Sequence, residues 1–133
     1  MLVIDTSAVL EVIVTRDPDQ RLVAHLDDDG DLHAPHLLDV EILHALRGHL
    51  RAGRLSIDRA ADVRANFAEL MISRYGHELL MERMWQLRDN LSAYDATFVA
   101  LAELLEAPLV TCDARVAAAP GTAAEVQLYR TEG

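Results

Sequence analysis

Residues 91–113 read LSAYDATFVALAELLEAPLVTCD and contain the clearest evidence for the fold class of the chain. Ser92 is a favourable N-cap for a helix that we expect to run to Glu106, because apolar residues follow it at helical spacing. The Ala-Pro pair at 107–108 ends that helix, and residues 109–112 then form a short apolar run typical of a buried strand. A helix that leads directly into a buried strand is the repeating unit of a parallel sheet.

The same alternation of short apolar runs and amphipathic segments extends over the rest of the chain. The Asp17-Pro18 pair predicts the start of one helix, Pro35 the start of a longer one, and Gly53 the end of the latter. This pattern predicts an α/β fold in which helices cover both faces of a mostly parallel sheet of four to five short strands. We expect strands at residues 2–4, 32–34, 71–75, 109–112 and 126–129, and helices at residues 7–14, 17–26, 35–52, 56–71, 77–88 and 92–106. Ser56 or Asp58 caps the helix at 56–71, and its apolar face consists of Ala60, Val63, Phe67, Leu70 and Met71.

Length and composition are those of an ordinary globular domain. The chain has 133 residues, of which 51% are hydrophobic and 26% charged, so we expect one domain over residues 1–133. No uncharged stretch approaches the roughly 20 residues that a membrane helix needs, and the N-terminus has no basic lead-in of a signal peptide. The single cysteine, Cys112, excludes an intrachain disulfide and favours a reducing compartment, so we expect a cytoplasmic protein without a membrane partner.

The charge balance excludes several classes of protein. There are 22 acidic residues against 12 basic ones, all of them arginine, and the formal net charge is −10. Such a chain repels a phosphate backbone at long range, which counts against a simple nucleic-acid binding module but not against a metal enzyme with a few local arginines. The absence of lysine excludes a P-loop and a Schiff-base mechanism, and it disfavours a receiver domain.

Two acidic residues directly follow predicted central strands. Asp5 comes after residues 2–4, and Asp113 comes after residues 109–112. Because parallel strands deliver their carboxyl ends to the same edge of a sheet, both carboxylates are expected to face one crevice. Either residue alone could simply cap the next helix, but the pair is better explained as a site.

Two further acidic residues lie on helix faces that should point to the core. Glu41 shares a stripe with Leu38 and Ala45, and Asp95 shares one with Phe98 and other apolar residues. A buried carboxylate needs a partner. For Asp95 the alternative is a capping box with Ser92, and for Glu41 it is an arginine partner such as Arg88.

Four converging carboxylates would repel one another unless a cation neutralised them. Oxygen-only ligands favour Mg²⁺, with Mn²⁺ able to substitute, over zinc. Zinc would require a set of cysteines and histidines, which Cys112 and the six histidines do not form.

The motifs around these acids resemble those of the PIN-domain family. The residues that carry the resemblance are IDTS at 4–7, VE at 40–41, LSAYDA at 91–96 and LVTCD at 109–113, in this order over essentially the whole chain. Within the family the chain most resembles the VapC toxins of bacterial toxin–antitoxin pairs. One departure is Arg115, which stands where some relatives carry another acid.

The resemblance implies a three-layer α/β/α fold and a Mg²⁺-dependent endoribonuclease. It also implies that the enzyme cleaves structured RNA of the tRNA or rRNA class, is neutralised by a VapB-type antitoxin and forms a homodimer. In this hypothesis Asp5 and Asp95 are the principal metal ligands, and Glu41 and Asp113 complete the catalytic site. The ion activates water for attack on a phosphodiester.

Four further residues are candidates for substrate contacts. Thr6 or Ser7 could bind the scissile phosphate or steady Asp5, although capping of the first helix is an equal alternative. Arg88 and Arg115 could clamp a phosphate, or they could be exposed salt-bridge partners.

The antitoxin is expected to place an arginine in the acidic crevice. Val9, Val12, Ile13 and Val14 could form a groove for its amphipathic helix, the alternative being core packing.

Three other functions were weighed. The nearest is a PIN nuclease with another role, such as RNA processing or DNA cleavage, but the compact length favours the toxin. An aspartate-dependent phosphatase would need a second Asp two residues after the first, where this chain has Ser7, and also a lysine. A non-enzymatic acidic interaction module would not need four carboxylates in this order.

Overall fold

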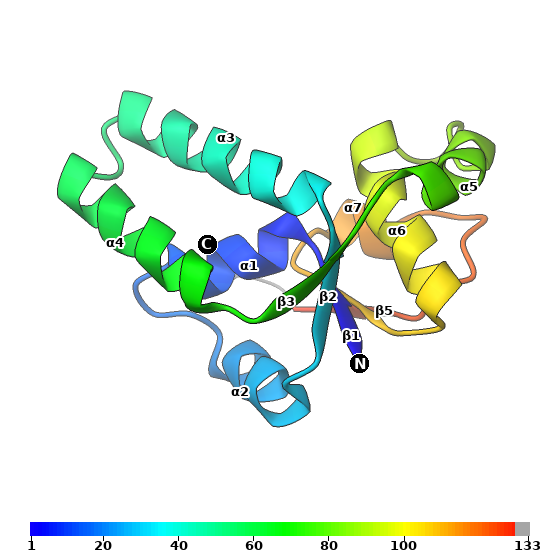
Figure 1. Ribbon diagram of the computed structural model, residues 1–133, viewed down its shortest axis with the longest axis horizontal. Coiled ribbons are helices and arrows are strands. Elements are labelled where there is room, and N and C mark those ends of the chain that lie inside the picture. Colours follow the sequence, from blue (N-terminus) through cyan, green and yellow to red (C-terminus); the bar gives the residue numbers. More distant parts are fainter. Residues whose placement is uncertain (130–133) are drawn as a thin grey trace.

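The computed structural model describes residues 1–129 as a five-stranded parallel sheet between two layers of helices (Figure 1). The strand order is β3-β2-β1-β4-β5, and every neighbouring pair is parallel. The strands are β1 (Leu2–Ile4), β2 (Leu32–Pro35), β3 (Ile72–Tyr75), β4 (Leu109–Thr111) and β5 (Val126–Leu128). The helices are α1 (Thr6–Ile13), α2 (Gln20–Asp29), α3 (Leu37–Arg51), α4 (Ile57–Glu69), a 3₁₀ turn (Glu78–Leu80), α5 (Met81–Gln86), α6 (Ala93–Leu105) and α7 (Ala114–Ala118).

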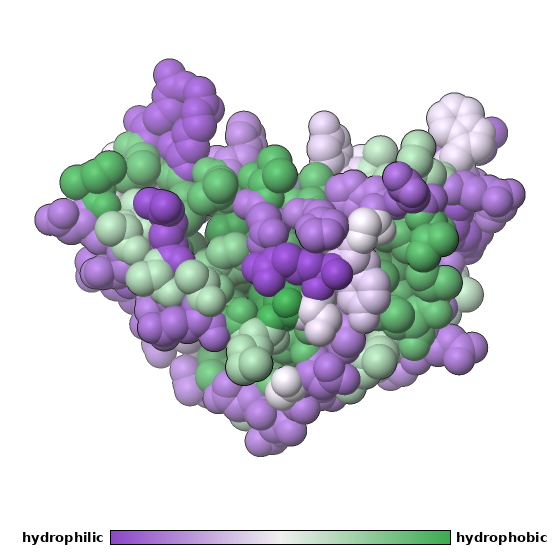
Figure 2. Space-filling model, viewed as in Figure 1, coloured by the Kyte–Doolittle hydropathy of each residue, from purple (hydrophilic) through white to green (hydrophobic). Residues whose placement is uncertain are grey.

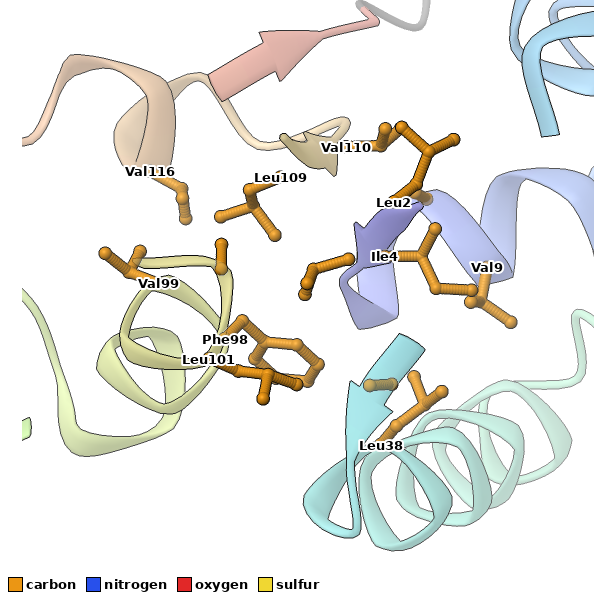
Figure 3. Packing of buried hydrophobic residues seen from close by; sticks show 14 of the residues in the cluster. Leu2, Ile4, Val9, Leu38, Phe98, Val99, Leu101, Leu109, Val110 and Val116 are labelled. Carbon is orange, nitrogen blue, oxygen red and sulfur yellow. The ribbon is translucent and has the colours of Figure 1, made fainter. Parts of the chain in front are cut away.

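The central strands explain why the sheet is parallel. All residues of β1 and β4 are buried, as expected for strands covered by helices on both faces. Figure 3 shows Ile4 directed toward Val9 of α1, whereas Leu109 lies against Val99 and Val116 of α6 and α7. The sheet therefore separates α1 and α3 on one side from α6 and α7 on the other, which confirms the three-layer α/β/α prediction.

Most of the predicted helix boundaries are confirmed. Ser92 caps α6 by accepting the backbone N–H of Asp95, and Ser56 caps α4 in the same way. Gly53 follows the end of α3 with φ +73°, a conformation that glycine adopts at little cost. No helix of residues 1–129 is long and apolar enough to cross a membrane.

Three details of the sequence-based prediction are wrong. Asp19, not Asp17, caps α2, because its carboxylate accepts the N–H of Arg21. Pro35 ends β2 instead of starting α3, since it stays in register with Tyr75 of β3. The segment expected as one helix at 77–88 is divided into the 3₁₀ turn and α5.

Two other details concern exposure and range. Met71, assigned to the apolar face of the fourth helix, is 87% exposed because α4 ends at Glu69 and the chain then turns into β3. The expected domain of residues 1–133 includes residues 130–133, which lie outside the described part of the chain.

Leu101 and Leu104 on α6 offer a test of the packing. Leu101 is fully buried, whereas Leu104 is 54% exposed. Leu101→Ala should lower the free energy of unfolding by about 2–5 kcal/mol, because it removes buried methyl groups and leaves a cavity. Leu104→Ala should change it by about 0.5 kcal/mol or less. Urea denaturation of both variants measures the difference, and equal effects would contradict the placement of α6 in the core.

Candidate active site

The four predicted acidic residues come from four elements that meet at the carboxyl edge of the sheet. Asp5 directly follows β1, and Asp113 lies two residues after β4. Glu41 is in the second turn of α3, which begins soon after β2, and Asp95 is in the first turn of α6. Figure 1 shows the starts of α3 and α6 on either side of this edge. The topology thus brings together residues that are up to 108 positions apart in the sequence.

Asp5 has the most constrained carboxylate of the four. It is 7% exposed, and its Oδ1 accepts the N–H of Ala8 at 3.0 Å and the hydroxyl of Ser7 at 2.6 Å. Its Oδ2 accepts the hydroxyl of Thr111. Asp5 is therefore both the N-cap of α1 and a member of the acidic group, so capping does not compete with a place in the site.

Ser7 and Thr111 connect the ends of β1 and β4. The hydroxyl of Ser7 accepts the backbone N–H of Cys112 at 2.9 Å, and that of Thr111 accepts the N–H of Asp113 at 3.0 Å. Each hydroxyl also donates to Asp5, so each acts both as a hydrogen-bond donor and as an acceptor. The role of Thr111 in holding Asp5 was not predicted from the sequence. Its position could have indicated this role, because Thr111 is a polar residue at the end of a buried strand and a buried hydroxyl needs a hydrogen-bond partner.

Glu41 is held by a hydroxyl and not by an arginine. The side chain of Thr6 donates to Glu41 Oε1 at 2.6 Å, and Glu41 is half-buried. Arg88, the alternative partner, instead donates to the carbonyl of Trp85, and its guanidinium lies 4.6 Å from the centroid of the indole ring. The hydroxyls of Thr6 and Ser7 thus orient carboxylates, and their contact with a substrate stays a prediction.

Asp95 and Asp113 differ in their electrostatic surroundings. Desolvation raises the pKa of the Asp95 carboxyl, and the negative charge of Asp113 raises it further. The hydrogen bond from Arg115 keeps the pKa of the Asp113 carboxyl below its ordinary value. Arg115 forms a 3.0 Å ion pair with Asp113 while its own side chain is 87% exposed. The salt-bridge alternative describes Arg115 in this structure, and its phosphate-clamp role stays a prediction.

Asp5 is coupled electrostatically to the same group. Burial raises the pKa of the Asp5 carboxyl despite its three hydrogen bonds, and the charge of Asp95 raises it further. Burial also raises the pKa of the neighbouring Cys112 thiol to about 12, so the free thiol is not ionised at neutral pH and is a poor nucleophile. The chemistry at this edge therefore belongs to oxygen ligands.

The donor set fits a hard divalent cation, although the side chains are not already arranged around one point. Within residues 1–129 no group of three or more Asp, Glu, His or Cys side chains is positioned to hold a metal ion. The raised pKa values of Asp5 and Asp95 nevertheless mark carboxylates that need charge compensation when they ionise. Oxygen donors are those that Mg²⁺ and Mn²⁺ prefer. Asp113 would have to leave Arg115 to contribute.

The apolar residues at 9–14, a candidate groove for an antitoxin helix, are not exposed as such a groove would require. Val9 and Ile13 are buried in the core at 1% and 5% exposure. Val12 and Val14 are half-buried and pack against the same core. Core packing, the alternative considered for these residues, is what the structure shows.

Comparison with known proteins identifies the family of the chain. Residues 2–121 match the family model of the PIN domain. Ribonuclease VapC1 of Mycobacterium tuberculosis (strain ATCC 25618 / H37Rv) is 39% identical over 129 residues, covering 96% of this chain and 97% of the relative.

Two solved structures share the fold at low sequence identity. The structure of VapBC2 from Rickettsia felis bound to a DNA fragment from their promoter covers 96% of this chain and 97% of its own, with a TM-score of 0.72 and 10% identity. The structure of Mycobacterium tuberculosis VapC20, a Sarcin-Ricin loop cleaving toxin, covers 89% of this chain and 94% of its own. Its TM-score is 0.64 and its sequence identity is 15%.

The chain belongs to the PIN-domain family, as its four acidic motifs predicted. The resemblance to VapC proteins is also confirmed, since the relative with 39% identity over nearly the full length is a VapC ribonuclease.

The raised pKa of Asp95 predicts how stability depends on pH. The folded state binds this proton more tightly than the unfolded state, whose carboxyl titrates near its ordinary value of 3.8. Stability therefore falls as pH rises from about 4 through the folded-state pKa, and it stays reduced at neutral pH. Asp95→Asn cannot ionise, so its free energy of unfolding relative to the parent should increase over that range. Urea denaturation in EDTA between about pH 4 and pH 7 measures this, and a difference that shrinks with pH would contradict the prediction.

Proposed function

We propose that this protein is a Mg²⁺-dependent endoribonuclease and the toxin of a VapBC-type toxin–antitoxin pair. The observation that carries the proposal is the convergence of Asp5, Glu41, Asp95 and Asp113 at the carboxyl edge of the sheet. Two of these carboxyls, Asp5 and Asp95, have raised pKa values and so disfavour ionisation in the absence of a cation. Membership of the PIN-domain family and the VapC ribonuclease among its relatives support the same reaction.

The chain's own residues hold two of the four carboxylates in place. Hydrogen bonds from Ser7, Ala8 and Thr111 fix Asp5, and Thr6 fixes Glu41 from an adjacent position on α1. Asp5 and Asp95 serve as the principal ligands, and Glu41 and Asp113 complete the set directly or through water. When bound, Mg²⁺, or Mn²⁺ in its place, supplies Lewis-acid stabilisation of phosphate charge and a bound water of lowered pKa.

Arg115 and Arg88 are the proposed cationic contacts to the substrate. Arg115 is already at the site, 3.0 Å from Asp113, and it would transfer from this carboxylate to a phosphate when Asp113 engages the ion. Arg88 forms no ion pair within residues 1–129, and its guanidinium is stacked on Trp85. Thr6 donates to Glu41 and Ser7 donates to Asp5. These two hydroxyls are the proposed uncharged contacts to the same phosphate. The proposed substrate is a structured RNA of the tRNA or rRNA class; the structural neighbour VapC20 is described as a toxin that cleaves the Sarcin-Ricin loop.

A VapB-type antitoxin is the proposed partner, as in the VapBC2 complex of Rickettsia felis. An arginine from the antitoxin would neutralise the acidic pocket and displace the ion. We propose further that the protein acts as a homodimer in the cytoplasm.

Conversion of the principal ligands to amides tests the function. Asp5→Asn or Asp95→Asn should reduce cleavage of total RNA by at least about 100-fold, because an amide neither carries the ligand charge nor binds Mg²⁺ strongly. Discrete fragments should appear with Mg²⁺ and the parent chain, and disappear with EDTA. Asp28→Asn, an exposed position on α2 outside the acidic site, is the matched control and should cleave like the parent. Full cleavage by either ligand variant, with the fold retained, would refute the assignment.

Thr6 tests whether Glu41 must be oriented. Thr6→Val keeps the shape of the side chain but removes the hydroxyl that donates to Glu41. We expect a loss of about tenfold or more in metal affinity or activity, the usual effect of removing a group that orients a ligand. Thr6→Ser retains the hydroxyl and should restore most of the activity. Titration of Mg²⁺ against cleavage rate separates weaker metal binding from slower chemistry, and equal rates for the Val and Ser variants would show that Glu41 needs no support.

A further inference from the structure

The positive charge of this acidic chain is concentrated in one segment. Between His44 and Arg64 there are five arginines and two aspartates, a formal charge of +3. Since the whole chain carries −10, all other residues together carry −13. The segment spans the end of α3, the connecting turn and the first half of α4, which form a hairpin that projects from the sheet (Figure 1). We call residues 44–64 the basic hairpin.

Three arginines of the basic hairpin are exposed and have no acidic partner. Arg47, Arg51 and Arg54 form no ion pair within the described residues 1–129. The Nε of Arg54 donates to the neutral acceptor Nδ1 of His49 at 3.0 Å, which orients its guanidinium without cancelling its charge. By contrast, four arginines outside the hairpin pair with carboxylates: Arg21–Asp19, Arg74–Asp39, Arg83–Glu103 and Arg115–Asp113.

The two exposed arginines of α3 lie on one side of the helix together with His44. His44, Arg47 and Arg51 fall within about 60° of one another around the helix axis. With a rise of 1.5 Å per residue, Arg47 and Arg51 lie about 9 Å and about 15 Å along the axis from Glu41. Arg54 follows in the turn. Around the axis, Arg47 lies about 120° and Arg51 about 80° from Glu41, so the arginines lie beside and beyond the acidic group on the same helix.

We propose that the basic hairpin binds the phosphate backbone of the RNA substrate at nucleotides outside the cleavage position. This inference rests on the proposed nuclease function and adds where the substrate lies. The rest of the surface repels RNA through its charge of −13, and a metal ion compensates only at the pocket. Guanidinium groups without acidic partners provide the local attraction that the substrate needs, and they bind phosphate through paired N–H donors.

The position of the arginines favours a phosphate ligand over a protein segment. A shallow pocket of about 370 Å³ lies between α3 and α4, and a partner helix would need such an apolar groove for its anchoring side chains. Arg47, Arg51 and Arg54 do not line that pocket. Its lining residues are Ile42, Leu43, Ala61, Arg64, Ala65, Phe67 and Ala68.

Binding measurements on an uncleaving chain test the proposal. In an Asp5→Asn background, the variant R47Q/R51Q/R54Q is compared with R16Q/R21Q/R74Q, which removes the same formal charge from positions outside the hairpin. The probe is fluorescently labelled bulk transfer RNA, titrated at several salt concentrations. The hairpin variant should bind about tenfold more weakly at low salt, and the slope of log K against log salt should decrease by about two. The control should retain both the parent affinity and most of the parent slope.

The outcomes separate this proposal from the nuclease function. Cleavage by the parent together with an unchanged slope in the hairpin variant overturns the role of the hairpin and leaves the nuclease intact. Unchanged RNA binding with weakened binding of a purified VapB-type antitoxin assigns the hairpin to a protein partner and also overturns the proposal. If the parent neither binds nor cleaves RNA under any metal, the nuclease function fails and the hairpin proposal with it. Circular dichroism of all variants confirms that the fold is retained.

Discussion

The site depends on one buried carboxylate, that of Asp5, and on the hydroxyls that surround it. Ser7 comes from α1 and Thr111 from β4, and both donate to Asp5 while they accept backbone N–H groups that follow β4. The same carboxylate accepts from Ala8 and so begins α1. A single charged group thus fixes the start of the first helix and the relative position of the two central strands. A buried carboxylate is costly unless its lone pairs are satisfied, which explains why polar residues lie at the ends of two otherwise apolar strands.

This grouping of carboxylates lowers the stability of the folded state at neutral pH. Burial disfavours the charged form of Asp5, and the charges of Asp95 and Asp113 add repulsion at the same edge of the sheet. Ordinary packing would place neutral residues at these positions, since a cluster of carboxylates lowers stability at neutral pH. Arg115 relieves part of the repulsion by pairing with Asp113. In an enzyme of the proposed kind, the metal ion and then the arginine of an antitoxin would relieve it more completely.

Charge is divided between two parts of the molecule. The acidic pocket and most of the surface are negative, whereas the basic hairpin of residues 44–64 is positive. For a polyanionic substrate this division supplies both orientation and attraction, because the positive segment begins one to two turns beyond Glu41 on the same helix. An enzyme with its basic residues spread evenly over the surface would have the same net charge without this directional field.

Local patterns in the amino-acid sequence were sufficient to predict the fold class and to single out the four acidic residues. Short apolar runs and period-3.6 patterns, with the helix cap at Ser92, predicted the alternation of strands and helices because these signals are local. The rule that parallel strands end at one edge was sufficient to group Asp5 with Asp113. The partners of these groups follow from the three-dimensional packing: Thr111 donates to Asp5, Thr6 donates to Glu41, and Arg115 pairs with Asp113. Arg88 is stacked on Trp85 and is not paired with an acid within residues 1–129. Partners that lie 35 or 106 residues apart in the sequence are selected by packing, which no local pattern contains.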